Sequence, residues 1–172
     1  MQSLQYKSEV CASCGQSTTY ILPVDLGTLE ILQAVANAIR KKGVNEVHPR
    51  REMELKPQEG LPVGRMAQEG YLTSNQVGNL SRPRFHGLIA SIDGRPGWYC
   101  LTRKGAAFLR GANIPKYAIV SKALGRQIGY WNEQDQRITA RELVKSDLPR
   151  WELDIVDGRV VNMGSLQNTL NI

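Results

Sequence analysis

Residues 72–111 of this 172-residue chain carry its densest structural signals, and they read LTSNQVGNLSRPRFHGLIASIDGRPGWYCLTRKGAAFLRG. Thr73 or Ser74 can cap a short helix over residues 75–80, because a hydroxyl at this place accepts a hydrogen bond from a free N–H group of the first turn. A second helix is expected to begin at Ser81, which can act as the next cap. The segment therefore opens with two short helices joined by a tight turn.

A cluster of turn-forming residues follows these helices. Residues 93–97 (DGRPG) separate two apolar runs, residues 88–92 and residues 98–101, and this pattern is typical of a β-hairpin. Thr102 can then cap a helix over residues 103–110. The predicted order is helix, turn, helix, two-stranded ribbon and helix.

Upstream, the sequence predicts a long amphipathic helix over residues 25–42. Its apolar residues recur three or four positions apart and form one stripe, made of Leu29, Leu32, Val35, Ala36 and Ile39. Asp25 or Thr28 can cap its start, and Gly43 can end it. Three basic residues at 40–42 complement the negative C-terminal end of the helix.

The other segments are less regular. In residues 1–24, the stretch YILPV contains Pro23, which cannot donate to a sheet ladder, so an edge strand or an extended arm is expected there. Residues 44–71 predict a long connector with no more than short helical turns. Downstream of residue 113 we expect a small helix at 140–145 and a series of short strands, at residues 117–120, 127–131, 137–139, 151–156 and 159–161.

Basic residues are concentrated in residues 79–112. This stretch holds six basic residues and one acidic residue, a net charge of +5 against +6 for the whole chain. Such asymmetry is typical of a nucleic-acid-binding surface, because each Lys or Arg set against a phosphate releases condensed counterions. The residues expected to contact the nucleic acid are Asn79, Ser81, Arg82, Arg84, His86, Arg95, Arg103 and Lys104.

Four motifs of this region resemble the winged helix-turn-helix of bacterial MarR-like regulators: LT at 72–73, GLI at 87–89, the turn at 93–97 and LTRKG at 101–105. In that superfamily a recognition helix leads into the Gly-Leu-Ile corner, and a β-hairpin wing follows it. The resemblance implies that residues 81–86 lie in the major groove. It also implies that Arg95 lies at the tip of the wing, near the minor groove or the DNA backbone.

The resemblance predicts an α+β fold with a winged helix-turn-helix core and a small β-rich C-terminal extension. Four regions follow from it: an arm at 1–24, a winged helix-like domain at 25–112, a β-rich segment at 113–161 and a polar tail at 162–172. We expect a protein that binds double-stranded DNA rather than RNA, as a transcriptional regulator or an accessory factor of a phage or mobile element. The alternative is a protein–protein interaction module built on the same scaffold, and both a homodimer and another protein partner remain open.

The chain has three cysteines, two of which form a Cys-x-x-Cys motif at Cys11 and Cys14. Two thiolates at this spacing supply half of a tetrahedral zinc site, and Gly15 after them is frequent in such turns. His48 or Cys100 can complete a metal site in this chain, as can a ligand from a symmetry mate. A pair of reduced thiols without metal is the other interpretation, so zinc is not a certain cofactor.

The sequence lacks the motifs of several enzyme classes and of membrane proteins. It has no glycine-rich phosphate loop, no Gly-x-Ser-x-Gly and no His-Glu-x-x-His, so no enzymatic activity and no catalytic residue are expected. No apolar run approaches the roughly 18 residues that a membrane span needs. Because the N-terminus also lacks a hydrophobic block of signal-peptide length, we expect a cytoplasmic protein.

Overall fold

The long helix α1, Leu26–Lys42, lies at the centre of the fold. Asp25 caps its start, since the N–H of Thr28 donates to Asp25 Oδ1 at 2.8 Å, and Gly43, with a φ of 64°, ends it. These features confirm the helix, its cap and its end as the sequence predicts them. Nearly every residue from Thr28 to Ile39 is buried, so other elements enclose α1 on more than one side.

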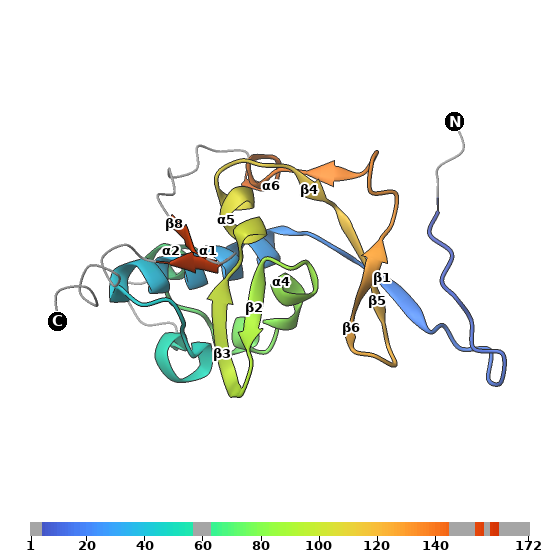
Figure 1. The fold of residues 1–172 in the computed structure, drawn as a ribbon, viewed down its shortest axis with the longest axis horizontal. Helices are drawn as coiled ribbons and strands as arrows, with labels where there is room; N and C mark the ends of the chain where they lie inside the picture. Colours follow the sequence, from blue (N-terminus) through green and yellow to red (C-terminus); the bar gives the residue numbers. More distant parts are fainter. Residues whose placement is uncertain (1–4, 57–62, 145–153, 157–158, 162–172) are drawn as a thin grey trace.

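The computed structural model describes residues 5–56, 63–144, 154–156 and 159–161. Its other helices are α2 (Val63–Glu69), α3 (Ser74–Val77), α4 (Ser81–Phe85), α5 (Arg103–Leu109) and α6 (Ala140–Val144). Its strands are β1 (Thr19–Pro23), β2 (Ile89–Ile92), β3 (Arg95–Leu101), β4 (Ile114–Pro115), β5 (Tyr117–Ser121), β6 (Arg126–Tyr130), β7 (Arg137–Ile138), β8 (Asp154–Val156) and β9 (Arg159–Val161). The fold is therefore of the α+β class, as predicted (Figure 1).

The connector between α1 and α3 contains two helical pieces. They are a π-helical turn at Pro49–Met53 and the helix α2, in line with the short helical turns that the sequence allows over residues 44–71. Asn37 of α1 donates from its buried amide to the carbonyl of Ala67 at 2.9 Å and so fixes α2 against α1. No helix of the described residues is long and apolar enough to cross a bilayer.

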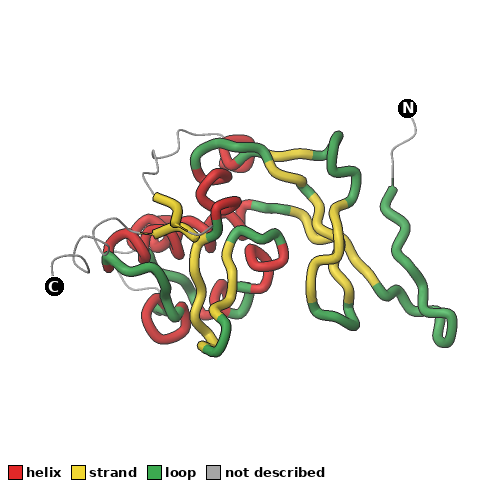
Figure 2. Tube along the Cα trace, viewed as in Figure 1, coloured by secondary structure: helices red, strands yellow, loops and turns green. Residues whose placement is uncertain are grey.

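One antiparallel sheet joins two regions that are far apart in the sequence. Its strand order is β1-β5-β6, so the strand of the N-terminal arm pairs with a strand from the segment after residue 113. β1 is an edge strand, as the proline in it predicts. In Figures 1 and 2 this sheet lies beside the helical body, and the arm that precedes β1 extends beyond it.

The other strands form antiparallel pairs, β2 with β3, β4 with β7 and β8 with β9. The β2–β3 hairpin confirms the ribbon expected around residues 93–97. Val47 forms an isolated antiparallel bridge with Tyr99 of β3. The expected strand start at residues 151–153 and the expected tail at 162–172 lie outside the described residues.

Candidate nucleic-acid interface

The two short helices α3 and α4 follow each other closely in the chain, and we call them together the α3–α4 rod. Thr73 caps α3 with a capping box, because its Oγ1 accepts from the N–H of Gln76 at 3.2 Å and its own N–H donates to Gln76 Oε1 at 2.9 Å. Only residues 78–80 separate the helices, and both Gly78 and Leu80 have right-handed helical backbone angles. The tight turn that the sequence predicts is therefore a distorted helical turn.

Pro83 lies in the first turn of α4 and accounts for one missing bond between the two helices. A proline has no N–H to donate to the carbonyl four residues earlier, and its ring clashes with that carbonyl. In place of this bond, the carbonyl of Asn79 accepts from the N–H of Arg82 at 3.1 Å, a tighter i→i−3 arrangement. Leu80 is the N-cap of α4 and makes no side-chain capping bond, so the prediction that Ser81 caps this helix is wrong.

The corner between α4 and the hairpin depends on three residues of the GLI and LTRKG motifs. Gly87 has a φ of 71°, which lets the chain turn sharply from α4 into β2. The hydroxyl of Thr102 donates to the carbonyl of Gly87 at 2.5 Å and accepts from the N–H of Gly105 at 3.0 Å. A Cβ on Gly105 would overlap the carbonyl of Leu88, so this position requires glycine.

Two of the arginines expected at the interface are paired with carboxylates. Arg82 Nη1 donates to Asp25 Oδ2 at 2.5 Å. Arg95, in the hairpin, forms an ion pair with Glu46, and its guanidinium lies 4.1 Å from the centre of the Trp98 ring. These contacts neutralise the positive charge at both places.

His86 does not reach the surface. Its side chain is fully buried, which corrects the prediction that it contacts nucleic acid. Neither ring nitrogen makes a hydrogen bond of ordinary geometry among the described residues, although the Pro23 carbonyl lies close enough to favour the charged ring. Burial, and secondarily the charge of Lys104, lower the pKa of His86 to about 4. The neutral ring therefore belongs to the core.

Three other basic residues converge beside α4. Arg84 and Arg126 line the same pocket, which has a volume of about 240 Å³ and also includes Tyr130. Lys104 Nζ donates to the hydroxyl of Tyr130 at 2.6 Å and lies 4.5 Å from the centre of that ring. We call Arg84, Lys104, Arg126 and Tyr130 the basic cleft. Among the described residues, no carboxylate forms an ion pair with these three cations.

The sequence predicts two members of the basic cleft and misses the other two. Arg84 and Lys104 are in the expected set, whereas Arg126 and Tyr130 come from the β5–β6 hairpin. That hairpin lies outside residues 79–112, the stretch in which the basic residues are concentrated. Arg126 and Tyr130 line the same pocket as Arg84 only through the tertiary arrangement of this hairpin, which no local signal in the sequence indicates.

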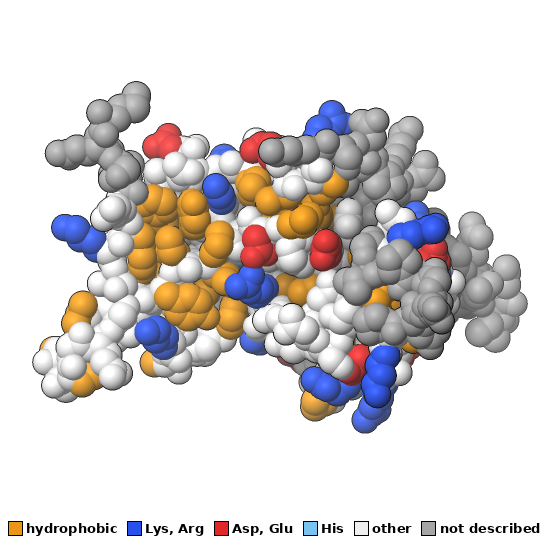
Figure 3. All heavy atoms as spheres, turned by 180° about the vertical axis from the view of Figure 1, so that it is seen from behind, with side chains coloured by type: hydrophobic (Ala, Val, Ile, Leu, Met, Phe, Trp, Pro, Cys, Tyr) orange, Lys and Arg blue, Asp and Glu red, His pale blue; other side chains and the backbone are white. Residues whose placement is uncertain are grey.

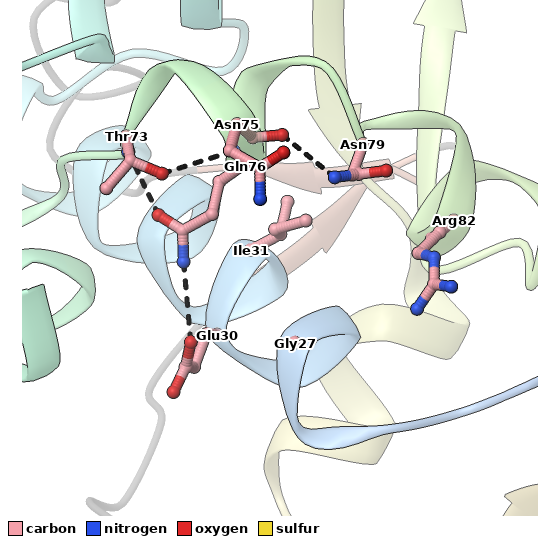
Figure 4. A pocket seen from close by; sticks show the side chains of 8 residues that line it. All are labelled: Gly27, Glu30, Ile31, Thr73, Asn75, Gln76, Asn79 and Arg82. Carbon is pink, nitrogen blue, oxygen red and sulfur yellow. Dashed lines mark hydrogen bonds between the residues drawn. The ribbon is translucent and has the colours of Figure 1, made fainter.

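A second hollow lies between α1 and the α3–α4 rod (Figure 4). Its volume is about 460 Å³, and its lining is Gly27, Glu30, Ile31, Thr73, Asn75, Gln76, Asn79 and Arg82. Asn79 donates to the carbonyl of Asn75 at 2.9 Å, and Gln76 donates to Glu30 at 3.4 Å. Because Glu30 contributes a carboxylate and Arg82 is neutralised by Asp25, this hollow suits hydrogen-bonding groups better than phosphates.

The last two expected contact residues are separate from the basic cleft. Arg103 is exposed at the start of α5. Ser81 lines a third hollow of about 300 Å³, together with His48 and Gly97. The eight residues expected at the interface are thus divided among the basic cleft, two other hollows, the hairpin, the start of α5 and the core.

The expected metal ligands are not brought together within the chain. No group of three or more His, Cys, Asp or Glu residues that could hold a metal ion occurs in the described part of the chain. Cys100 is buried in β3. His48 packs edge-on against Trp98, and its Nδ1 accepts from the N–H of Arg51 at 3.2 Å. His48 and Cys100 therefore do not complete a site with Cys11 and Cys14.

Comparison of the chain with models of known protein families, with curated protein sequences and with solved structures gives no match.

Proposed function

We propose that this protein binds the phosphate backbone of double-stranded DNA through the basic cleft, using a winged helix-turn-helix arrangement. Arg84 of α4 and Arg126 of β6 line one pocket with Tyr130, Lys104 of α5 contacts the same tyrosine, and no carboxylate among the described residues forms an ion pair with these cations. This convergence is the single observation that carries the proposal. An unneutralised cluster of this kind attracts phosphates and releases their counterions.

The order of elements supports the winged-helix part of the proposal. α1, α2 and the α3–α4 rod are followed by the β2–β3 hairpin, and Val47 forms an isolated bridge with Tyr99 of β3. The GLI and LTRKG motifs have clear structural roles, because they form the corner that joins the rod to the hairpin. The resemblance of these motifs to DNA-binding regulators favours DNA over RNA.

The basic cleft changes which residues we assign to the interface. Arg84, Lys104 and Arg126 take the central role, and Tyr130 positions Lys104 through a hydrogen bond of 2.6 Å. Arg95 contributes only when a phosphate competes with Glu46 for its guanidinium. The proposed contacts go to the backbone, which gives affinity without sequence specificity.

Binding of a fluorescein-labelled duplex at a series of salt concentrations tests the proposal. Arg84→Ala and Arg126→Ala are each expected to weaken binding and to reduce the slope of log K against log salt by about 0.9 for one lost phosphate contact. Lys41→Ala is the matched control, because it removes one positive charge at the C-terminal end of α1, where Lys41 pairs with Glu69. No affinity for any duplex at low salt would overturn the proposal.

A second candidate function, protein–protein interaction, is favoured by a different observation. Exposed apolar side chains gather over the β1–β5–β6 sheet on the face shown in Figure 3. On the same face, Lys and Arg side chains are scattered and several lie beside Asp or Glu. If the duplex titrations fail, this surface becomes the main functional candidate.

A further inference from the structure

The N-terminal arm contains a tight hairpin around Cys11 and Cys14. The N–H of Cys11 donates to the carbonyl of Gln16 at 2.8 Å, and the N–H of Gly15 donates to the carbonyl of Cys11 at 2.9 Å. Gly15 has a φ of 71°, a conformation that glycine adopts without strain. The turn therefore holds both cysteines in a defined backbone geometry.

This turn directs backbone N–H groups at the sulfur of Cys11. The N–H groups of Cys14 and Ser13 lie within hydrogen-bonding reach of this sulfur. The thiolate is the form that binds metal ions, and such N–H donors offset the negative charge that collects in a thiolate site. The hairpin is thus suited to hold a metal-bound thiolate at an accessible position, and Cys14 is exposed.

Two thiolates supply only half of a structural zinc site, which normally has four ligands in a tetrahedron. The sequence contains one further cysteine and two histidines, Cys100, His48 and His86. Cys100 lies in β3, His48 lies before the π-helical turn and His86 lies at the end of α4. None of the three forms a metal-binding group with Cys11 and Cys14. This chain therefore has no sulfur or imidazole ligand left to complete the site.

We infer that two copies of this chain bind one zinc ion between their N-terminal hairpins, with Cys11 and Cys14 of each copy as its four ligands. A second copy brings an identical turn with the same N–H donors, and a two-fold arrangement places the two pairs around one ion. On binding, Zn²⁺ takes the place of four thiol protons, which are released to solvent. Because neither the basic cleft nor the α3–α4 rod takes part, this inference does not depend on the proposed DNA binding.

The surface around the hairpin fits a second protein molecule. Six large apolar side chains are exposed in the described part of the chain, and four of them lie on the hairpin and the neighbouring sheet: Val10, Tyr20, Leu124 and Ile128. Apolar surface gathered in this way marks an interaction site. In Figures 1 and 3 the arm stands away from the helical body, which leaves room for a partner at this end of the molecule.

Metal content and molar mass, measured on the full chain purified without chelator, test the inference. We expect one zinc ion for every two chains and a dimer by light scattering. A chelator should convert the dimer into monomers, and added Zn²⁺ should restore it. Co²⁺ in place of zinc should give the visible absorption of tetrahedral thiolate coordination, saturating at one ion for two chains.

Serine substitutions identify the ligands. Cys11→Ser and Cys14→Ser should each abolish zinc retention and dimerisation while leaving the circular dichroism spectrum unchanged. Cys100→Ala is the control: it removes the buried thiol of β3 and should leave zinc retention and dimerisation unchanged. One zinc ion in each monomer, a metal-free protein with a Cys11–Cys14 disulfide, or a dimer that persists in the serine variants would each overturn the inference. Duplex binding by the same variants is a separate readout, because the basic cleft is intact in all of them.

Discussion

The carboxylate of Asp25 connects the start of α1 to α4 through Arg82. Its Oδ1 accepts from the N–H and the hydroxyl of Thr28, each at 2.8 Å, and its Oδ2 accepts from Arg82 Nη1 at 2.5 Å. The Asp25 carboxylate therefore caps the N-terminus of α1 and also holds the α3–α4 rod against α1. Burial raises the pKa of Asp25, but the bonds from Thr28 and the charge of Arg82 outweigh this effect and lower it.

Two substitutions at Asp25 separate these roles. Asp25→Ala removes the cap and the ion pair, and it is expected to lower the free energy of unfolding by about 1 kcal/mol or more. Asp25→Asn keeps a good capping group but loses the charge, so its cost should be clearly smaller, because partly exposed ion pairs contribute little. Urea denaturation at neutral pH measures both. Equal costs for the two variants would show that the cap contributes nothing.

Glu46 is expected to weaken nucleic-acid binding by holding Arg95. Glu46→Gln removes the carboxylate that pairs with Arg95 and leaves its guanidinium over Trp98. If Arg95 then contacts a phosphate, the affinity for a duplex should rise several-fold at low salt and the salt dependence should steepen by about 0.9.

A change of net charge alone can also raise affinity, so the experiment requires a control. Glu133→Gln removes one exposed carboxylate elsewhere on the molecule and gives the same net charge. Only a larger effect of Glu46→Gln supports a direct role of Arg95. If the two variants bind equally, the hairpin does not contact the nucleic acid.

The local elements of this fold are predictable from the sequence, because each depends on residues a few positions apart. The cap of α1 by Asp25, the cap of α3 by Thr73 and the turn before Arg95 are examples. The basic cleft is not predictable in the same way. Arg84 of α4 and Arg126 of β6 line the same pocket, and the pairing of β1 with β5 that places this sheet spans about a hundred residues.

Side-chain pairing across the fold is also hidden from the sequence. The density of basic residues in 79–112 indicates a positive surface, but Asp25 and Glu46 lie outside that segment and neutralise two of its arginines. The burial of His86 has a similar cause. A histidine next to a glycine corner carries no local sign that the β1–α1 connection, through Pro23 and Asp25, closes over it.

His86 should make the protein sensitive to acid. Its pKa is about 4 in the folded state, because burial and the charge of Lys104 disfavour the charged ring. Arg82 adds a smaller effect of the same sign. The Pro23 carbonyl and the charge of Asp25 favour the charged ring and raise the pKa. In the unfolded chain a histidine titrates near 6.5. Between about pH 4 and pH 6.5 the unfolded state therefore binds more protons than the folded state. The free energy of unfolding falls as the pH decreases through this range.

The size of this loss is about 3 kcal/mol across the whole interval, at 1.36 kcal/mol for each pKa unit. His86→Leu removes the titrating ring and should flatten the dependence of unfolding free energy on pH in this range, even where its stability at pH 7 differs. Urea denaturation at several pH values measures the slope. An unchanged slope in the variant would assign the acid sensitivity to other groups, such as Asp25.

The corner formed by the LTRKG and GLI motifs makes the sharpest prediction about stability. Gly105 lies in α5, where alanine is normally the better helix former, so propensity alone predicts that Gly105→Ala stabilises the protein. The structure predicts the opposite, because the added Cβ would overlap the carbonyl of Leu88 and also crowd the side chain of Leu101. We expect a loss of about 1–3 kcal/mol in the free energy of unfolding, the usual cost of overpacking a dense site.

Gly27→Ala in the first turn of α1 is the matched control. The added Cβ has ordinary contacts only, so this substitution should raise stability by up to about 1 kcal/mol. Thermal and urea denaturation of both variants compare the two effects. A stabilising Gly105→Ala would show that the backbone of Leu88 does not approach α5 as closely as the structure shows.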